Sequence, residues 1–204
     1  YAQLRKGGFN NHLYLAIHSF RSHESMKGSS TSDGANFELM YDEFQYDKTN
    51  GGIQEYWTDH YALIIAANEM IHDIDSLGNP DANTLINRAE AKFLRAFAFF
   101  DLVRTFGRVP LIDFKIVNPG DVNIPKVESE NEIYELIDAD LTEASNVLPP
   151  SWDPPYSAGR LTKGAALALH ARTQLFRSNW AAALAAAKAV IDLDKYELVS
   201  NFGS

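Results

Sequence analysis

The chain has 204 residues, of which 46% are hydrophobic and 22% are charged, a composition typical of a globular protein rather than a disordered one. Its net charge of −9 argues against a nucleic-acid partner, because binding to phosphates needs clustered Lys and Arg. The absence of cysteine excludes disulfides, thiolate nucleophiles and cysteine-ligated zinc sites.

The first quarter of the chain combines a helical segment with a long polar segment. Residues 9–20 place Leu13, Ile17 and Phe20 at helical spacing, which predicts a first helix. Residues 22–52 are expected to form an irregular surface loop, because their first part is rich in Ser and Gly. Within this loop, residues 37–46 could form a short strand or a loop laid across helices.

Two long helices are predicted next, and a short turn should make them antiparallel. An apolar stripe over residues 53–77 predicts the first, which ends at the Gly and Pro of 78–80. The stretch 87–111 predicts the second, which Gly107 and Pro110 end in the same way. Its phenylalanine stripe is expected in the core and its cations on a solvated flank. These are Phe93, Phe97, Phe100 and Phe106 in the stripe, and Arg88, Lys92 and Arg95 on the flank.

The remaining helices are predicted from their N-terminal caps. Ser129 and Glu132 form a capping box that begins a third helix, and residues 149–160 form a proline-rich bridge. Thr162 is the predicted N-cap of the next helix, and Asn179 or Ser178 that of the last. We therefore expect one all-α domain over residues 1–204, built from antiparallel hairpins like those of tetratricopeptide (TPR) proteins, although no strict 34-residue repeat is present.

No pattern of catalytic or metal-ligating residues is found. The six histidines lack the H-x-x-x-H or H-E-x-x-H spacing of a zinc site, so no metal is predicted. The chain also lacks G-x-S-x-G and a glycine-rich phosphate loop. The absence of these patterns argues against an enzyme, and no cofactor is predicted.

Polar and aromatic residues of two loops are candidates for binding a ligand. Lys27, Asp33, Asn36 and Tyr41 could offer hydrogen bonds and a ring face to a saccharide, whose C–H groups can cover an aromatic ring. The alternative is a loop ordered by its own packing. Trp152, in the proline-rich bridge, is a second candidate.

Two stretches resemble the SusD/RagB family of outer-membrane nutrient-binding lipoproteins. The first is RAEAKFLRAFAFFDLVRTFGRVPLI, residues 88–112, and the second begins GRLTKGAALALHAR at residue 159. The matching residues that we take as the family's structural hallmark are Glu90, Arg95, Asp101, Gly107, Pro110 and Lys163. The resemblance covers most of this chain and about the N-terminal half of a typical member.

The resemblance implies a TPR-like scaffold held by a lipid anchor on the extracellular face of the outer membrane. Members bind oligosaccharides or other nutrients without cleaving them and pass them to a TonB-dependent, SusC-like transporter. Ligand contacts in the family come partly from a loop that corresponds to residues 24–41. This loop contains no tryptophan here, so the resemblance does not imply starch as the ligand.

Three functions are compatible with the sequence. The preferred one is capture of a glycan or other nutrient for a polysaccharide uptake system. The alternative is a TPR-like scaffold that docks on the transporter or binds a peptide, and the third is an α-helical glycosidase. The longest apolar runs are far below the roughly 20 residues of a membrane span. The lipid anchor that the resemblance implies is expected upstream of Tyr1, in a longer protein.

Overall fold

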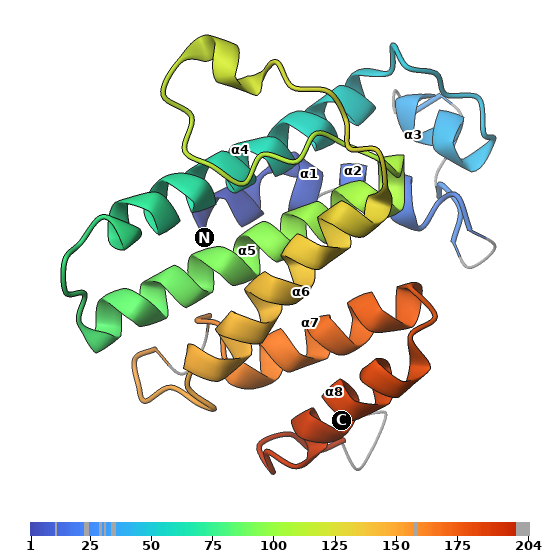
Figure 1. Ribbon diagram of the computed structural model, residues 1–204. Coiled ribbons are helices and arrows are strands. Elements are labelled where there is room, and N and C mark those ends of the chain that lie inside the picture. The colour runs from blue at the N-terminus through green and yellow to red at the C-terminus, as the bar shows by residue number, and fades with distance from the viewer. Residues whose placement is uncertain are drawn as a thin grey trace. The chain divides into compact units, whose positions relative to one another are not determined.

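The chain is folded into helices joined by loops (Figure 1). The computed structural model describes residues 1–10, 12–22, 25–28, 30, 32–33, 36–156 and 159–198, and no strand occurs among them. Two compact units are present, Tyr1–Ile65 and Ala66–Ser204, and their boundary falls inside the helix α4, Gly51–Asp75. The all-α prediction is confirmed, whereas a single domain over 1–204 stays a prediction.

The N-terminal unit combines short helices with the first part of α4. They are η1 (Ala2–Arg5), α1 (Gly7–Asn10), α2 (His12–His18) and α3 (Asn36–Asp42). The helix predicted over 9–20 is present as α1 and α2, and residue 11 between them lies outside the described residues. The expectation of a strand or loop at 37–46 is wrong for its first part, because α3 is a helix.

Aromatic rings form the interior of the N-terminal unit. Tyr56 and His60 lie one turn apart on α4, and their rings stack with centroids 4.0 Å apart. The ring centroid of Phe9, on α1, also lies 4.0 Å from that of His60. The Nε2 atom of His18 lies 2.8 Å from the Tyr56 hydroxyl. His60 is fully buried, so this histidine belongs to the core.

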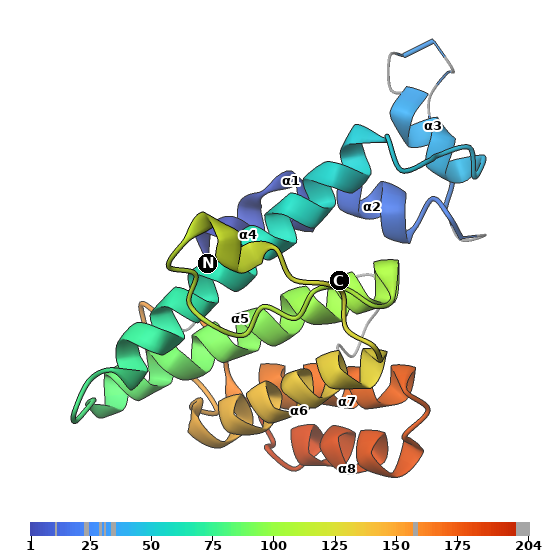
Figure 2. The ribbon, with the colours of Figure 1, turned by 45° about the horizontal axis from the view of Figure 1, so that its top comes forward.

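The C-terminal unit stacks helices in chain order (Figure 2). They are α5 (Ala82–Phe106), α6 (Glu130–Val147), α7 (Lys163–Phe176) and α8 (Trp180–Ile191), and each packs on the next. The connector between α5 and α6 contains the short helix η2 (Pro119–Val122). The end of α4 runs antiparallel to α5, since its residues Asn68 and Asp75 contact Arg95 and Arg88 in reverse order.

Side-chain caps fix the starts of these helices. Asp81 accepts a hydrogen bond from the Thr84 N–H at the start of α5. The predicted capping box is present at α6, where the Glu132 carboxylate accepts the Ser129 N–H at 2.9 Å. Thr162 caps α7 as predicted, whereas Asn179 precedes α8 without a capping hydrogen bond from its side chain.

Helix α5 is the most deeply buried element of the C-terminal unit. Phe93 and Phe100 are buried as predicted, but Phe97 and Phe106 are only half-buried. Phe99, which lies off the predicted stripe, has no exposed surface. The buried surface of α5 is therefore wider than one stripe, because both the end of α4 and α6 pack against it.

The cations of α5 do not form a solvated flank, and that expectation is wrong. Arg95 is 5% exposed, and its Nε and Nη2 atoms each donate to the Asp140 carboxylate of α6 at 2.8 Å. Its Nη1 atom donates to the Asn68 side chain of α4 at 2.8 Å. Lys92 and Arg88 continue this line of charges toward Glu143 and Asp75.

The other hallmark residues have structural contacts as well. Glu90 is 6% exposed and accepts two hydrogen bonds from Arg160, at 2.9 and 3.0 Å. Asp101 is fully buried and pairs with Arg104, so its carboxylate does not lie on the surface. Pro110 is half-buried, and Lys163 begins α7 with its N–H donating to the Pro149 carbonyl at 2.9 Å.

We predict that Arg95→Leu destabilises the protein by about 3–5 kcal/mol, because it leaves the Asp140 carboxylate buried without its partner. Chemical unfolding followed by circular dichroism would measure the free energy. The control is Arg108→Leu, an exposed arginine of the connector, for which a change within about 0.5 kcal/mol is expected. Equal losses in the two variants would contradict the prediction.

Gly107→Ala should also destabilise the protein, by about 1–3 kcal/mol, because Gly107 has φ +70° and ψ −124°, a backbone region that favours glycine. An added Cβ would also lie 3.1 Å from Oε1 of Glu130. Thermal unfolding would test this against Gly120→Ala in η2, where a Cβ meets nothing within 4 Å. A Gly107 variant as stable as the Gly120 variant would contradict it.

Candidate functional site

The predicted loop residues of the N-terminal unit are organised by an ion pair. The Lys27 ammonium group donates to Oδ2 of Asp33 at 2.6 Å and to the carbonyls of Ser30 and Gly28 at 3.3 and 3.4 Å. Only 4% of the Lys27 side chain is exposed, so it closes the loop on itself. Asn36, the first residue of α3, is exposed.

Tyr41 lies in the interior of the N-terminal unit rather than in a surface site. It is 1% exposed, and its hydroxyl donates to Oδ1 of Asn50 at 2.8 Å. Burial, together with a smaller contribution from Tyr46 that Arg21 opposes, raises the pKa of the Tyr41 phenol to about 12. Its position therefore does not fit the prediction of a ring face offered to a ligand.

Trp152 lies in the proline-rich bridge of the C-terminal unit. The Arg160 guanidinium carbon lies 3.9 Å from the centre of its ring system, and the indole N–H donates to the Leu161 carbonyl at 2.7 Å. Arg160 is in turn held by Glu90 of α5. One ring face and the polar atom of Trp152 are thus already used in fixing the bridge.

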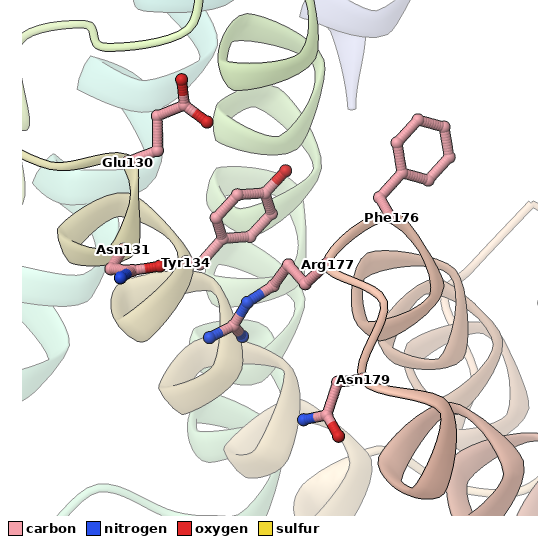
Figure 3. A pocket seen from close by; sticks show the side chains of 6 residues that line it. All are labelled: Glu130, Asn131, Tyr134, Phe176, Arg177 and Asn179. Carbon is pink, nitrogen blue, oxygen red and sulfur yellow. The ribbon is translucent and has the colours of Figure 1, made fainter.

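A polar pocket of about 410 Å³ lies between the start of α6 and the end of α7 (Figure 3). Its volume lies within the range of small-molecule sites, roughly 300–1,000 Å³. The residues that line it are Glu130, Asn131, Tyr134, Phe176, Arg177 and Asn179. None of them was predicted from the sequence to bind a ligand.

Local structure explains how these side chains come together. The capping box begins α6 at Glu130, so Glu130 and Tyr134 are four residues apart and lie on one face of its first turns. Helix α7 ends at Phe176, and Ser178 has φ +58°, so Arg177 and Asn179 flank a tight turn into α8. Figure 3 shows Tyr134 and Arg177 reaching toward each other from the two sides.

The aromatic rings of the pocket lie against arginines. The Arg177 guanidinium carbon lies 5.0 Å from the Tyr134 ring centre, within the range of a cation–π contact. Arg104 of α5 lies 5.3 Å from the Phe176 ring centre, and Phe100 packs edge-on against Phe176 at 5.3 Å. Burial raises the pKa of the Tyr134 phenol, as does Glu130, while Arg177 opposes the shift. The phenol therefore stays protonated and can donate a hydrogen bond.

Asp138, one turn beyond Tyr134, holds the far wall in place. Its carboxylate pairs with Arg177, accepts the Gln174 amide at 2.7 Å and lies 3.3 Å from Nε2 of His170. Gln174 accepts a hydrogen bond from the Asn179 amide at 3.0 Å. One carboxylate of α6 thus fixes three groups from α7 and the following turn.

Metal-binding clusters and membrane-spanning helices are both absent from the described part of the chain. It contains no group of three or more His, Asp or Glu side chains placed to hold a metal ion, and His23 lies outside it. No helix there combines the length and apolarity that crossing a membrane requires.

Comparisons with known proteins point to one family. A family model described as "Starch-binding associating with outer membrane" (SusD-like) matches residues 8–175. A SusD-like protein of Formosa agariphila is 33% identical over 149 residues, which are 73% of this chain and 29% of that protein.

Solved structures agree with that match. A SusD-like protein of Bacteroides fragilis superimposes with a TM-score of 0.80 at 26% identity, over 98% of this chain and 37% of its own. A laminarin-binding SusD-like protein gives a TM-score of 0.78 at 28% identity, over 92% and 40%. This chain thus spans less than a third of the curated relative and about two-fifths of these structures.

We predict that Asp138→Asn lowers the free energy of unfolding near pH 6. The difference from the unaltered protein should shrink as the pH falls below about 4. Although burial acts to raise it, hydrogen bonds from His170 and Arg177 hold the pKa of Asp138 below its usual value. A depressed folded-state pKa gives stability that is present above the unfolded pKa and is lost as the pH falls through the folded pKa.

Urea unfolding of the Asp138→Asn variant and of the unaltered protein between pH 3 and pH 6 would test this dependence. Asp153→Asn, at an exposed acid of the proline-rich bridge, serves as control and should show little change across the range. A loss for Asp138→Asn that is constant with pH would contradict the prediction.

Proposed function

The chain belongs to the SusD-like family, whose members are described as starch-binding and associated with the outer membrane, and we propose that it captures oligosaccharides at the cell surface. The observation that carries this proposal is the family match over residues 8–175, which includes α2 to α6 and most of α7. The laminarin-binding neighbour supports a glycan as the ligand. Both favour glycan binding over a scaffold that binds only peptides.

In this proposal the protein binds and does not cleave. It holds the glycan on the extracellular face of the outer membrane and passes it to a TonB-dependent, SusC-like transporter. A lipid group upstream of Tyr1 supplies the anchor. The chain spans only part of its relatives. The anchor, the cell-surface position and the transporter are therefore proposed from the family's mode of action.

Within the N-terminal unit, we place the ligand contacts on the loop that precedes α3. Asn36 is exposed and makes no hydrogen bond within the described part of the chain, so its amide is available to sugar hydroxyls. Asp33 is exposed in the same loop, where Lys27 holds its Oδ2 atom. Lys27 and Tyr41 act by fixing the loop and α3, and Trp152 offers only the remaining parts of its ring system.

We predict saturable binding of at least one neutral glycan from a panel of laminarin, starch and xyloglucan, with no cleavage. Calorimetry on the 204-residue chain would measure binding, and an assay for new reducing ends would detect hydrolysis. Asn36→Ala should weaken binding about threefold to tenfold, the loss of one hydrogen bond. The control is Asn83→Ala, which removes an exposed amide from the first turn of α5.

No binding to any glycan of the panel, or reducing ends that increase with time, would overturn the proposal. An equal effect of the two asparagine variants would overturn the placement of the contact at Asn36 and leave glycan capture standing.

A further inference from the structure

The polar pocket of the C-terminal unit presents hydrogen-bonding groups that the protein itself does not use. In the described part of the chain, the Tyr134 hydroxyl, the Asn131 side-chain amide and the Glu130 carboxylate have no hydrogen-bond partner. Polar side chains at other helix contacts of this unit, such as Arg95 and Gln174, are paired. The three unpaired groups come from two turns of one helix, so they face one volume.

An apolar ring borders the same volume. Phe176 is 53% exposed although it ends a packed helix, and its edge-on contact with Phe100 leaves ring surface open to solvent. In Figure 3 the Phe176 ring, the Tyr134 hydroxyl and the Glu130 carboxylate point to the same side. An aromatic face beside hydroxyl, amide and carboxylate groups matches a pyranose, which has C–H groups on its faces and hydroxyls around its rim.

The charges of the pocket favour a neutral ligand. Arg177 is paired with Asp138 and Arg104 with Asp101, so neither guanidinium lacks a counter-charge. An anionic ligand would face the Glu130 carboxylate, and a cationic ligand would face the Arg177 guanidinium. A hydroxyl donates and accepts at once, and can therefore pair with the carboxylate and with the amide alike.

We propose that this pocket is a second glycan subsite, which takes one or two sugar units of a neutral oligosaccharide. Phe176 stacks on a sugar ring, and Glu130, Asn131 and Tyr134 bind its hydroxyls. The proposal rests on the proposed function for the class of ligand. It goes beyond that function in placing a contact on the C-terminal unit, apart from the loop that precedes α3.

The walls are fixed before any ligand arrives, which favours binding. Asp138 holds Arg177 and, through Gln174, Asn179, while the capping box fixes the first turn of α6. Gly107 leaves room for the Glu130 side chain, since a Cβ at that position would lie 3.1 Å from its Oε1. Preorganised groups lose little conformational entropy on binding.

Hydrogen exchange with maltohexaose or laminarihexaose would locate the subsite. The peptides over residues 129–135 and 174–180 should gain protection in the 204-residue chain. A double variant, Asn131→Ala with Tyr134→Phe, should lose that protection and bind at least about tenfold more weakly at this site, because two hydrogen bonds are removed. Phe176→Ala should have a similar effect through the lost ring contact.

Two controls keep the test specific to the pocket. Tyr156→Phe removes an exposed hydroxyl and Phe114→Ala an exposed ring, and neither residue lines the pocket. Protection of the loop before α3 without any change at 129–135 and 174–180 would overturn the subsite and leave glycan capture intact. No binding anywhere would overturn both. Protection by a charged probe alone, oligogalacturonate or chitosan oligomers, would overturn the assignment of a neutral ligand.

Discussion

The pairing of Arg95 with Asp140 is the constraint on which the C-terminal unit depends. Arg95 also bonds Asn68 of α4 and the Asp113 carbonyl of the connector, so one side chain joins four segments. Asn68 in turn donates to the Ile112 carbonyl at 2.7 Å. A buried guanidinium tolerates few alternative arrangements, because any slip of α5 against α6 would leave two charges without partners in the interior.

Helix α6 passes this constraint on to the pocket. Asp140 and Asp138 are two residues apart and therefore project from different faces of the helix. Asp140 binds Arg95 of α5, whereas Asp138 binds Arg177 at the end of α7. Two carboxylates of one helix thus fix both of its neighbours. The pocket lies where this arrangement ends, at the first turn of α6.

Local signals in the sequence were sufficient for much of the fold. Apolar periodicity and the caps at Ser129 and Thr162 predicted the long helices. They failed at α3, because Leu39 and Tyr41 are two residues apart, a spacing that also occurs in strands. Arg95 was misplaced because a charged residue is seldom buried unless it is paired, and its partner lies 45 residues away. The pocket was missed for a similar reason, because its two walls meet only through tertiary packing.

The two proposed contact regions differ in what a ligand must displace. In the loop before α3, Lys27 already occupies one oxygen of Asp33 and two backbone carbonyls, so a sugar that needs those atoms competes with internal bonds. In the pocket, the polar side-chain groups of Glu130, Asn131 and Tyr134 have no hydrogen-bond partner among the described residues. A sugar hydroxyl there replaces water rather than a protein group, which makes the exchange favourable without rearrangement. Of the two proposed contact regions, one would therefore have to adapt to a ligand, whereas the other is already formed.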